Sequence, residues 1–260
     1  MAMIEALLWD VDGTLAETEQ QGHRTAYNQA FAQLGLEWCW DEERYAQLLR
    51  VRGGRKRMLA FMASLSDAPP PAEREALAWR LHALKTERYA ELVAAGTVPL
   101  RPGVRELIDE AAAGGLRQAI VSTTGRTNVE SLLRHHLGAG WSRLFTVVVS
   151  GDDTVSRKPE PEGYVRALAR LSLGPLAVLA LEDSFAGARA ARLADVPVVV
   201  TRSASAADEH IDEAVAVGPG LHTREGWRPT PSPERATAGR ITLDDLSDWR
   251  ARMDLVSHFD

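Results

Sequence analysis

The sequence predicts an α/β fold that combines a parallel sheet with an inserted, all-helical domain. Between residues 96 and 200, short apolar runs typical of strands alternate with segments whose apolar residues recur at helical spacing. Residues 17–95 interrupt this alternation and look purely helical, for example at Leu77, Leu81 and Leu84. We therefore expect a discontinuous core domain of residues 1–16 and 96–260, with a helical domain at residues 17–95.

The elements of the core domain can be assigned in chain order. Strands are expected at residues 4–9, 118–121, 144–149, 177–181 and 196–200, and helices at residues 104–111, 129–136, 162–171 and 184–193. The first of these helices ends at Gly114-Gly115, because glycine terminates helices. Residues 219–240 contain four prolines and three glycines without periodicity, which indicates a mobile or loosely packed connection. Residues 241–252 offer one more strand or helix.

Composition and charge exclude several classes of protein. The 260 residues are 45% apolar and 25% charged, as in globular proteins, and the net charge of −6 argues against binding to nucleic acid. No apolar run approaches the roughly 18 residues of a membrane span, and the N-terminus lacks the basic region of a signal peptide. Cys39 is the single cysteine, so no internal disulfide can form. We expect a cytoplasmic monomer with neither nucleic acid nor membrane as a partner.

Two aspartates follow the first predicted strand. In the segment Asp10-Val11-Asp12-Gly13-Thr14, the alternation of an extended chain places Asp10 and Asp12 on the same side. Two carboxylates so close together repel each other unless a cation or a proton lies between them. The segment is also consistent with a polar Asp-Gly turn. Its place at the carboxyl end of a strand favours a functional site, because α/β folds bind ligands there.

Three further polar segments occur where later strands end or helices begin. Ser122-Thr123-Thr124 could bind a phosphate group through hydroxyl and backbone N–H groups, or it could cap a helix. Lys158 lies among prolines before a predicted helix and could offer a point charge, or it could lie in solvent. Glu182-Asp183 follows an apolar strand and could complete a cation site, or Asp183 could cap the next helix.

The order and context of these four segments resemble the four motifs of the haloacid dehalogenase (HAD) superfamily. The matching residues are Asp10-Val11-Asp12-Gly13-Thr14, Ser122, Lys158 and Glu182-Asp183. The resemblance covers the core from about residue 4 to residue 200. It implies a Rossmann-like core and a hydrolase of phosphoric monoesters that depends on Mg²⁺.

The resemblance also implies a role for each catalytic residue. Asp10 would be the nucleophile that forms an aspartyl-phosphate. Asp12 would be the general acid that protonates the leaving alkoxide and then the general base that activates water. Ser122 and Lys158 would hold the oxygens of the transferred phosphoryl group.

The same resemblance implies a Mg²⁺ site. The ion would be bound by Asp10, by the backbone carbonyl of Asp12 and by Asp183, with Glu182 in support. A few carboxylates together with waters and phosphate oxygens suit Mg²⁺. Without such positive charge, the carboxylate of Asp10 would repel an approaching phosphate dianion.

The helical insertion lies between the first two motifs, as the C1-type cap domains of the superfamily do. Its sequence resembles the CbbY family, phosphatases that convert xylulose-1,5-bisphosphate, a Rubisco inhibitor, to xylulose-5-phosphate. This resemblance covers about residues 1–217, and no function is assigned to the chain from about residue 218 onward. It rests on Ala16-Glu17-Thr18-Glu19, Gly22-His23-Arg24, Trp40-Asp41, Tyr45, Gly53-Gly54, Arg57, Lys85-Thr86-Glu87-Arg88 and Arg101-Pro102-Gly103.

The family resemblance implies contacts to a sugar-phosphate substrate in both domains. The residues concerned are Glu19, His23, Arg24, Tyr45, Gly53, Gly54, Arg55, Arg57, Thr123, Thr124 and Asn128. Residues 44–57 contain six basic side chains and no acid, which suits a second phosphate group but also a solvated helix face. Tyr45 is equally consistent with the core and with a pocket.

Some residues depart from the family pattern. The family's Gly-Gly-Lys-Glu-Arg is replaced by Gly53-Gly54-Arg55-Lys56-Arg57, so two of its five residues differ. Trp9 stands where the family usually has phenylalanine, and we expect it to pack in the core. Cys39 lies between two tryptophans and is expected to be buried.

Three other functions are compatible with the motifs. A phosphomutase of the β-phosphoglucomutase type shares all four of them, but it would not steadily release inorganic phosphate. A general phosphatase could act on phosphoglycolate or hexose phosphates. A catalytically silent protein that binds phosphosugars is disfavoured by the intact Asp10, Asp12, Lys158 and Asp183.

Overall fold

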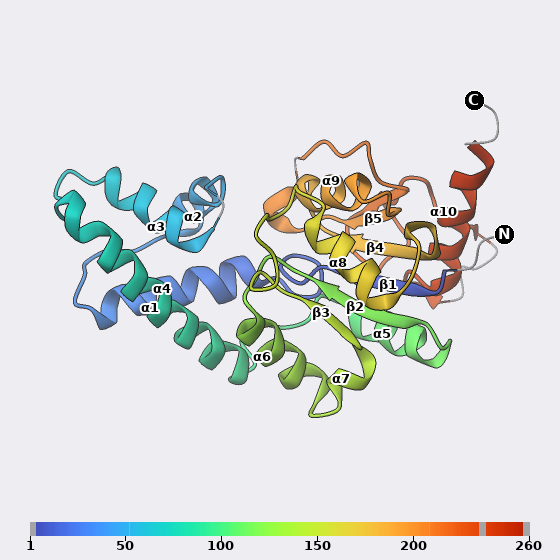
Figure 1. Ribbon diagram of the computed structural model, residues 1–260, viewed down its shortest axis with the longest axis horizontal. Helices are drawn as coiled ribbons and strands as arrows, with labels where there is room; N and C mark the ends of the chain where they lie inside the picture. The colour runs from blue at the N-terminus through green and yellow to red at the C-terminus, as the bar shows by residue number, and fades with distance from the viewer. Residues whose placement is uncertain (1–3, 52, 208, 234–237, 257–260) are drawn as a thin grey trace. The chain divides into compact units, whose positions relative to one another are not determined.

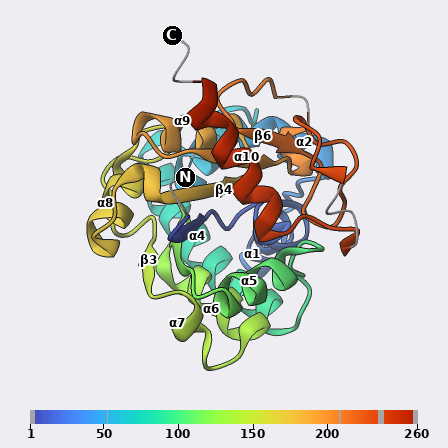
Figure 2. The ribbon, with the colours of Figure 1, turned by 90° about the vertical axis from the view of Figure 1, so that its right-hand side faces the viewer.

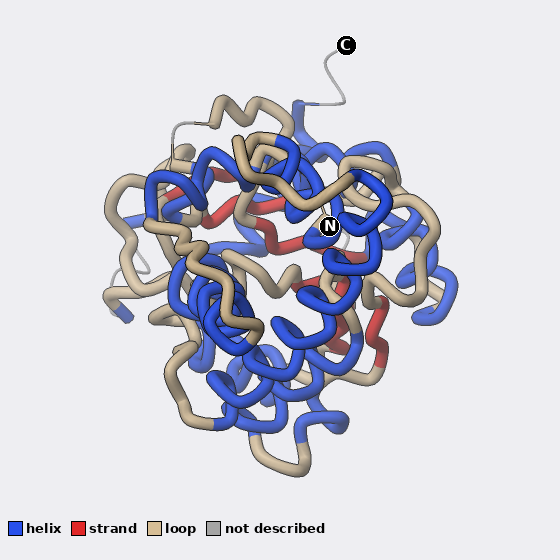
Figure 3. Tube along the Cα trace, turned by 90° about the vertical axis from the view of Figure 1, so that its left-hand side faces the viewer, coloured by secondary structure: helices blue, strands red, loops and turns tan. Residues whose placement is uncertain are grey.

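The chain divides into two compact units. The computed structural model describes residues 4–51, 53–207, 209–233 and 238–256. One unit, here called the sheet unit, comprises Met1–Glu17 and Pro99–Asp260, and the other, the helical unit, comprises Thr18–Val98. Residues 18–98, as far as they are described, form helices and loops without a strand (Figure 3).

The sheet unit is built on a parallel sheet, so the predicted α/β fold is confirmed. Among the described residues the sheet has six strands in the order β3-β2-β1-β4-β5-β6, and each neighbouring pair is parallel (Figure 1). The strands are β1 (Ala6–Trp9), β2 (Arg117–Val121), β3 (Val147–Val149), β4 (Val178–Glu182), β5 (Val198–Thr201) and β6 (Ala216–Gly218). The central strands β1 and β4 are buried along their whole length.

The sheet unit also contains helices. They are α5 (Val104–Ala113), α6 (Arg126–Leu137), α7 (Trp141–Leu144), α8 (Glu162–Leu171), α9 (Phe185–Leu193) and α10 (Leu243–Val256). Of these, α5, α8 and α9 pack directly on strands of the sheet. On one face, alternate strand residues such as Leu8 and Ala180 form a core with Tyr164 of α8 and Ala188 of α9.

Trp9 is fully buried, which confirms that it packs in the core. Its indole Nε1 donates to Gln118 Oε1 at 3.0 Å, and Gln118 Nε2 donates to the carbonyl of Ile108 in α5 at 3.1 Å. This pair of hydrogen bonds satisfies the polar atoms that a buried tryptophan and a buried glutamine bring into the core.

The structure corrects two expectations about strands. The strand predicted at residues 144–149 is confined to Val147–Val149, because Leu144 ends the short helix α7 and residues 145–146 connect it to the strand. The edge strand β6 was not predicted, since three residues are too few to show an alternating pattern.

Residues 219–240 were predicted to form a mobile or loosely packed connection, but the described residues 219–233 pack against α10, while residues 234–237 lie outside the described part of the chain. The rings of Trp227 and Trp249 stack with their centroids 4.8 Å apart, and Arg224 Nη1 lies 2.6 Å from Asp245 Oδ2. This packing could not be predicted from the proline and glycine content, because the packing depends on a few large side chains that lie far apart in the sequence. The segment leads into α10, which lies beside α5 (Figure 2).

The C-terminal segment also pairs with the sheet. Val217 of β6 and Arg228 exchange backbone hydrogen bonds of 2.8 Å in an antiparallel bridge. Gly218 leaves room for Trp227, since a Cβ there would overlap the indole ring. The outer strand β6 is therefore held by residues that follow it by about ten positions in the sequence.

The helical unit has its own aromatic core. Its helices are η1 (Glu19–Arg24), α1 (Thr25–Gln33), α2 (Glu42–Leu49), α3 (Gly54–Ala63) and α4 (Pro71–Ala94). The ring of Trp40 packs edge-on against Phe31 and Phe61, with centroid distances of 5.0 and 5.2 Å. Cys39 is exposed, so the prediction that it is buried is wrong: Trp40 turns into the core, and its neighbour turns outward. Among the described helices, none combines the length and apolarity needed to cross a bilayer.

Asp153 holds the loop that follows β3. Its Oδ2 accepts hydrogen bonds from the N–H and Oγ of Ser150 and from Arg126, and its Oδ1 accepts one from Arg170, at 2.7–2.9 Å. The same two guanidinium groups donate to the carbonyl of Val148 in β3, at 3.1 and 2.8 Å. Partial burial raises the pKa of Asp153, but the Ser150 and arginine donors outweigh it, so the pKa lies well below its ordinary value.

We predict that Asp153→Asn lowers the free energy of unfolding by about 2 kcal/mol at pH 7, because hydrogen bonds to a charged acceptor are worth about 1.5–3 kcal/mol each. A lowered folded-state pKa stabilises the fold above the unfolded pKa of about 3.9, and this stabilisation is lost as the pH falls further. Urea unfolding should show a smaller difference from wild type at pH 3 than at pH 7. The exposed helix pair of Asp109 supplies a control, since Asp109→Asn should cost less than about 1 kcal/mol. A difference for Asp153→Asn that does not change with pH would contradict the prediction.

Candidate active site

The carboxyl ends of β1 and β4 bring three acidic side chains together. Asp10 directly follows β1, Glu182 ends β4 and Asp183 directly follows it. The two strands are hydrogen-bonded neighbours in parallel register, with Trp9 opposite Leu181. Parallel strands end at one edge of the sheet, and α/β folds bind their ligands at this edge.

The three carboxylates lie close together in a buried place. Each offers an oxygen within 4.8 Å of the others, and none of the three residues is more than 6% exposed. Burial raises the pKa of Asp10 well above its ordinary range, with Glu182 and Asp183 adding to the rise. Burial, followed by the charge of Glu182, raises the pKa of Asp183 to about 7. Without a cation, Asp10 and Asp183 hold their protons more tightly than free aspartates do.

Lys158 supplies positive charge to this cluster. Its Nζ lies 2.6 Å from Asp10 Oδ1 and 2.6 Å from Glu182 Oε1, and it donates to the carbonyl of Val121 at 2.8 Å. Burial lowers the pKa of Lys158, but the carboxylates of Asp10 and Glu182 outweigh it, so the pKa rises above its ordinary value. The lysine therefore stays charged, and the alternative of a solvated side chain is wrong.

Glu182 retains one unused oxygen. Its Oε1 accepts from Lys158 and from the hydroxyl of Tyr164, whereas its buried Oε2 has no hydrogen-bond partner among the described residues. Gly187 of α9 lies so near that a Cβ at this position would overlap Oε2. A buried carboxylate oxygen without a donor is costly unless a cation or a water meets it.

The donor set fits a divalent cation. Mg²⁺ prefers carboxylate oxygens, uses only one or two protein carboxylates, and retains waters and phosphate oxygens in its coordination shell. The clustered oxygens of Asp10, Glu182 and Asp183 offer this chemistry, and the unpartnered Glu182 Oε2 agrees with it. The three residues could therefore hold the ion that the sequence analysis expected.

Asp183 is oriented by its neighbours. Ser203 Oγ, just beyond β5, donates to Asp183 Oδ2 at 2.6 Å. The alternative that Asp183 caps α9 is wrong, because the cap is Ser184, whose hydroxyl accepts from the N–H of Gly187 at 3.4 Å. Asp183 is thus left available for another role.

Asp12 lies outside the three-carboxylate cluster. Its Oδ2 accepts a hydrogen bond from the hydroxyl of Thr124, and the N–H of Thr124 donates to Ser122 Oγ at 3.0 Å. The segment after β2 is thereby linked to the segment after β1. The sequence analysis placed Thr124 near the substrate but did not foresee this contact with Asp12.

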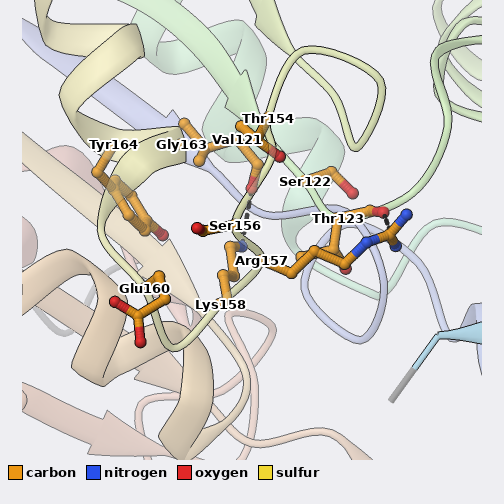
Figure 4. A pocket seen from close by; sticks show the side chains of 10 residues that line it. All are labelled: Val121, Ser122, Thr123, Thr154, Ser156, Arg157, Lys158, Glu160, Gly163 and Tyr164. Carbon is orange, nitrogen blue, oxygen red and sulfur yellow. Dashed lines mark hydrogen bonds between the residues drawn. The ribbon is translucent and has the colours of Figure 1, made fainter.

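A small pocket opens beside Lys158 at the ends of β2 and α8 (Figure 4). It is lined by Val121, Ser122, Thr123, Thr154, Ser156, Arg157, Lys158, Glu160, Gly163 and Tyr164. Arg157 Nη1 donates to the carbonyl of Thr123 across one side of it, at 2.8 Å. Ser122 and Lys158, the two residues expected to hold phosphoryl oxygens, thus both line this pocket.

Asn128 lies in α6 and is buried. Its Oδ1 has no hydrogen-bond partner among the described residues. Its expected contact with substrate stays a prediction.

In the helical unit, the partly buried Glu19 and the buried Tyr45 and Arg57 form a hydrogen-bonded network. The hydroxyl of Tyr45 donates to Glu19 Oε2 at 2.6 Å, and Arg57 Nη1 donates to the same hydroxyl at 3.3 Å. Arg57 Nε also donates to the carbonyl of Leu48 at 3.1 Å. Burial, and then the charge of Glu19, raise the pKa of Tyr45 well above its ordinary range. Tyr45 is fully buried and belongs to the aromatic core, so of the two alternatives, core or pocket, the structure shows the core.

His23 and Arg24 have structural partners in the same unit. His23 Nδ1 lies 2.9 Å from Lys85 Nζ, and its ring lies 4.3 Å from that of Tyr89. Arg24 donates to the carbonyl of Trp40 at 3.3 Å, among other acceptors. These contacts fix both side chains, and their expected contacts with substrate stay predictions.

The Gly53–Arg57 segment starts α3. Gly53 has φ +89°, a value that favours glycine, and a Cβ at Gly54 would overlap the hydroxyl of Tyr27. Arg55 lies 3.1 Å from Glu75 and stacks over Trp79 at 4.6 Å, so its charge is already partly neutralised. Of the two arginines expected to bind a second phosphate, Arg57 is buried and Arg55 pairs at the surface.

Comparison with known proteins decides the family. Residues 4–195 match the family described as haloacid dehalogenase-like hydrolases. The chain belongs to the haloacid dehalogenase-like hydrolases. This membership confirms the predicted HAD core and the prediction that the chain is an enzyme, a phosphatase of the hydrolase class.

Several relatives of this hydrolase carry the name CbbY, which confirms the predicted resemblance. CbbY of Rhodobacter capsulatus is 47% identical over 200 residues, covering 77% of this chain and 86% of that protein. The plasmid CbbY of Cupriavidus necator is 41% identical over 250 residues, covering 95% and 96%. The crystal structure of CbbY from Rhodobacter sphaeroides in complex with phosphate has 42% identity and a TM-score of 0.74, covering 82% of this chain and 92% of that one.

Two residues of the hydrolase site were missed from the sequence. Ser203 follows β5, the strand beside β4, so its place at a strand end was a signal that could have found it. Tyr164 lies six residues beyond Lys158 on α8 and reads in the sequence as an ordinary apolar position. Its contact with Glu182 requires the packing of α8 on the sheet, which no local pattern encodes.

We predict that Mg²⁺ binds more tightly as the pH rises, because the ion competes with a proton for Asp183, whose pKa is about 7. Raising the pH from 6 to 8 should strengthen binding about tenfold, since the deprotonated fraction of a group with this pKa rises by about that factor. Isothermal titration calorimetry of Mg²⁺ into the substrate-free protein measures the effect. Asp183→Asn should weaken binding at both pH values and reduce the difference between them to the part that comes from Asp10, whose pKa is also raised. Asp109→Asn, an exposed control, should behave as wild type. Binding independent of pH would contradict the assignment.

Proposed function

We propose that this hydrolase is a Mg²⁺-dependent phosphatase that removes one phosphate group from a sugar bisphosphate through an aspartyl-phosphate on Asp10. The observation that carries the proposal is the position of Asp10 in one buried cluster with Glu182 and Asp183, in direct contact with Lys158. The expected substrate is xylulose-1,5-bisphosphate, which would yield xylulose-5-phosphate. Its support is the CbbY relatives, one of which, a mutant of the Rhodobacter sphaeroides protein, has a crystal structure in complex with xylulose-(1,5)bisphosphate, at 41% identity to this chain and a TM-score of 0.74.

The first step forms a bond between Asp10 and phosphorus. The Asp10 carboxylate attacks the phosphoryl group, and the bond from phosphorus to the sugar oxygen breaks. Asp12 gives its proton to this oxygen, so the sugar leaves as a neutral alcohol. Thr124 orients Asp12 for this transfer through the hydrogen bond to its Oδ2.

The second step returns the enzyme to its starting state. Asp12, now a carboxylate, takes a proton from water, and the resulting hydroxide attacks phosphorus. The bond from phosphorus to Asp10 breaks, which releases inorganic phosphate and the Asp10 carboxylate. Asp12 has regained its proton and can act as an acid again.

Positive charge must balance the phosphate during both steps. Lys158 and Ser122 line one pocket and would hold the phosphoryl oxygens, and the charge of Lys158 is secured by its two carboxylate neighbours. Mg²⁺, held by Asp10, the Asp12 carbonyl and Asp183 with Glu182 in support, would supply the remaining neutralisation when bound. Lys158 also favours the ionised form of Asp10, which a nucleophile requires.

A sugar bisphosphate carries a second phosphate group that needs its own anchor. In the helical unit, the Gly53–Arg57 segment offers backbone N–H groups at the start of α3 together with two arginines. The buried Arg57, held by Tyr45 and Leu48, is better placed to act as a fixed cation than Arg55, which pairs with Glu75.

We predict that Asp10→Asn abolishes turnover, because an amide cannot act as the nucleophile, while the variant still folds. Phosphate release from xylulose-1,5-bisphosphate, measured with Mg²⁺ and with EDTA, tests both the nucleophile and the ion. Wild type should lose activity in EDTA and regain it with added Mg²⁺, and Asp109→Asn should match wild type. More than a small residual rate for Asp10→Asn would contradict the role of Asp10 as the nucleophile. Full wild-type activity in EDTA would contradict the dependence on Mg²⁺.

The choice of a bisphosphate is tested separately. We predict that replacing Arg55 and Arg57 together by methionine lowers kcat/KM for xylulose-1,5-bisphosphate about tenfold or more, because a charge-assisted contact is worth roughly 1.5–3 kcal/mol. A sugar monophosphate lacks the second group, so its kcat/KM should change little. Arg57→Met alone should account for most of the loss, and the exposed Arg50→Met in the same basic run should have no effect. Equal losses on both substrates would contradict the proposed anchor.

A further inference from the structure

Arg101 connects segments that are distant in the sequence. It lies between Leu100, which bridges to Ala16, and the start of α5, and it is only 9% exposed. Its Nη1 donates to the carbonyl of Gly13 and, at 2.7 Å, to that of Thr201.

The other terminal nitrogen binds two further segments. Nη2 of Arg101 donates to the carbonyls of Arg202 at 2.7 Å and Pro219 at 3.0 Å. Its Nε lies 3.3 Å from Glu17 Oε1. A guanidinium has five N–H groups in a rigid plane; here the two terminal nitrogens donate to four backbone carbonyls, and Nε faces Glu17 in an ion pair. A lysine has three donors on a flexible chain and cannot replace this arrangement.

Two of the segments that Arg101 binds are in contact with Asp183. Gly13 has φ +87°, and a Cβ at this position would overlap Asp183 Oδ2, so the backbone of Gly13 lies against this carboxylate. Ser203 directly follows Arg202, and its hydroxyl donates to the same oxygen at 2.6 Å. Both groups that confine Asp183 Oδ2 therefore belong to segments whose carbonyls Arg101 binds.

A third segment is the C-terminal one, to which the sequence analysis assigned no function. Pro219 begins it, and two residues beyond Arg101 the chain packs directly against it: Gly103 has φ +86°, and a Cβ there would lie 2.6 Å from the backbone nitrogen of His222. The N–H of Ile241 donates to the carbonyl of Leu221 at 2.9 Å and holds this turn in place. The C-terminal segment, through Pro219, thus binds the same guanidinium as Gly13 in the segment that follows β1.

We propose that Arg101 is a positioning residue for Asp183: it holds Gly13 and Ser203 against this carboxylate and couples the C-terminal segment to the cation site. The proposal rests on the proposed role of Asp183 as a Mg²⁺ ligand. A ligand that is held in place before the ion arrives binds it more tightly, and losing the residues that orient a ligand typically costs 10- to 100-fold in metal affinity. Arg101 does not itself contact substrate or ion in this scheme.

The test is Mg²⁺ binding by titration calorimetry on the full-length, substrate-free protein, at a temperature well below its unfolding midpoint. Arg101→Lys keeps the positive charge but has too few donors, and it should weaken Mg²⁺ binding about tenfold or more. Ser203→Ala removes the hydroxyl that meets Asp183 and should shift the affinity in the same direction, which also keeps the test decisive if Arg101→Lys fails to fold. In activity assays, saturating Mg²⁺ should restore much of kcat while KM for the sugar phosphate stays near wild type.

A second buried arginine provides the matched control. Arg250 of α10 is 2% exposed and donates to the carbonyl of Leu176, which precedes β4 at the end of the strand away from the acids. Arg250→Lys should lower the unfolding midpoint and leave Mg²⁺ affinity unchanged. Wild-type affinity in both Arg101→Lys and Ser203→Ala, or equal weakening in Arg250→Lys, would overturn the positioning role. A wild-type protein that binds no Mg²⁺ would instead overturn the proposed function, and this inference with it.

Discussion

The structure depends on one electrostatic conflict, the burial of three carboxylates at the end of β1 and β4. Isolated charges in such a place would be expelled or neutralised, and the raised pKa values of Asp10 and Asp183 express that tendency. Lys158 offsets part of the charge, since it lies 2.6 Å from both Asp10 and Glu182. A site with one lysine and three acids retains an excess of negative charge, and this excess attracts a small, hard cation. The burial of the three acids thus both constrains the structure and enables the site to attract a cation.

The groups around the three acids hold their carboxylates in place. Tyr164 and Lys158 occupy one oxygen of Glu182, and the glycine at 187 allows α9 to approach the other without a side chain in between. Gly13 does the same for Asp183 in a backbone conformation that other residues rarely adopt. Larger side chains at these two glycines would displace the carboxylates. The shape of the site therefore depends on the absence of side chains at these two glycines as well as on the charged groups.

Sequence reasoning predicted the parts of the site that follow from position along the chain. Asp10, Ser122 and Asp183 each come directly after a buried strand, and a parallel sheet places such residues at one edge. It failed where the outcome depends on packing between distant segments. The stacking of Trp227 on Trp249 packs the described part of a proline-rich stretch against α10, and Cys39 is exposed because its neighbour Trp40 turns into the core. The four carbonyls that Arg101 binds and its ion-pair partner Glu17 come from residues spread over two hundred positions, and no local pattern could foresee their convergence.

The two outer strands show how the sheet is prevented from growing. An exposed strand edge is a template on which another chain can add a strand, and this is a route to aggregation. At β3, the outward carbonyl of Val148 is already taken by Arg126 and Arg170. At β6, the backbone N–H and carbonyl of Val217 are both hydrogen-bonded to Arg228. The residue after Arg228 is Pro229, which has no N–H to continue a ladder. A second copy of the chain arriving at either of these two positions meets backbone groups that are already bonded, so the same arginines that hold the edges also keep neighbouring molecules from joining their sheets at these points.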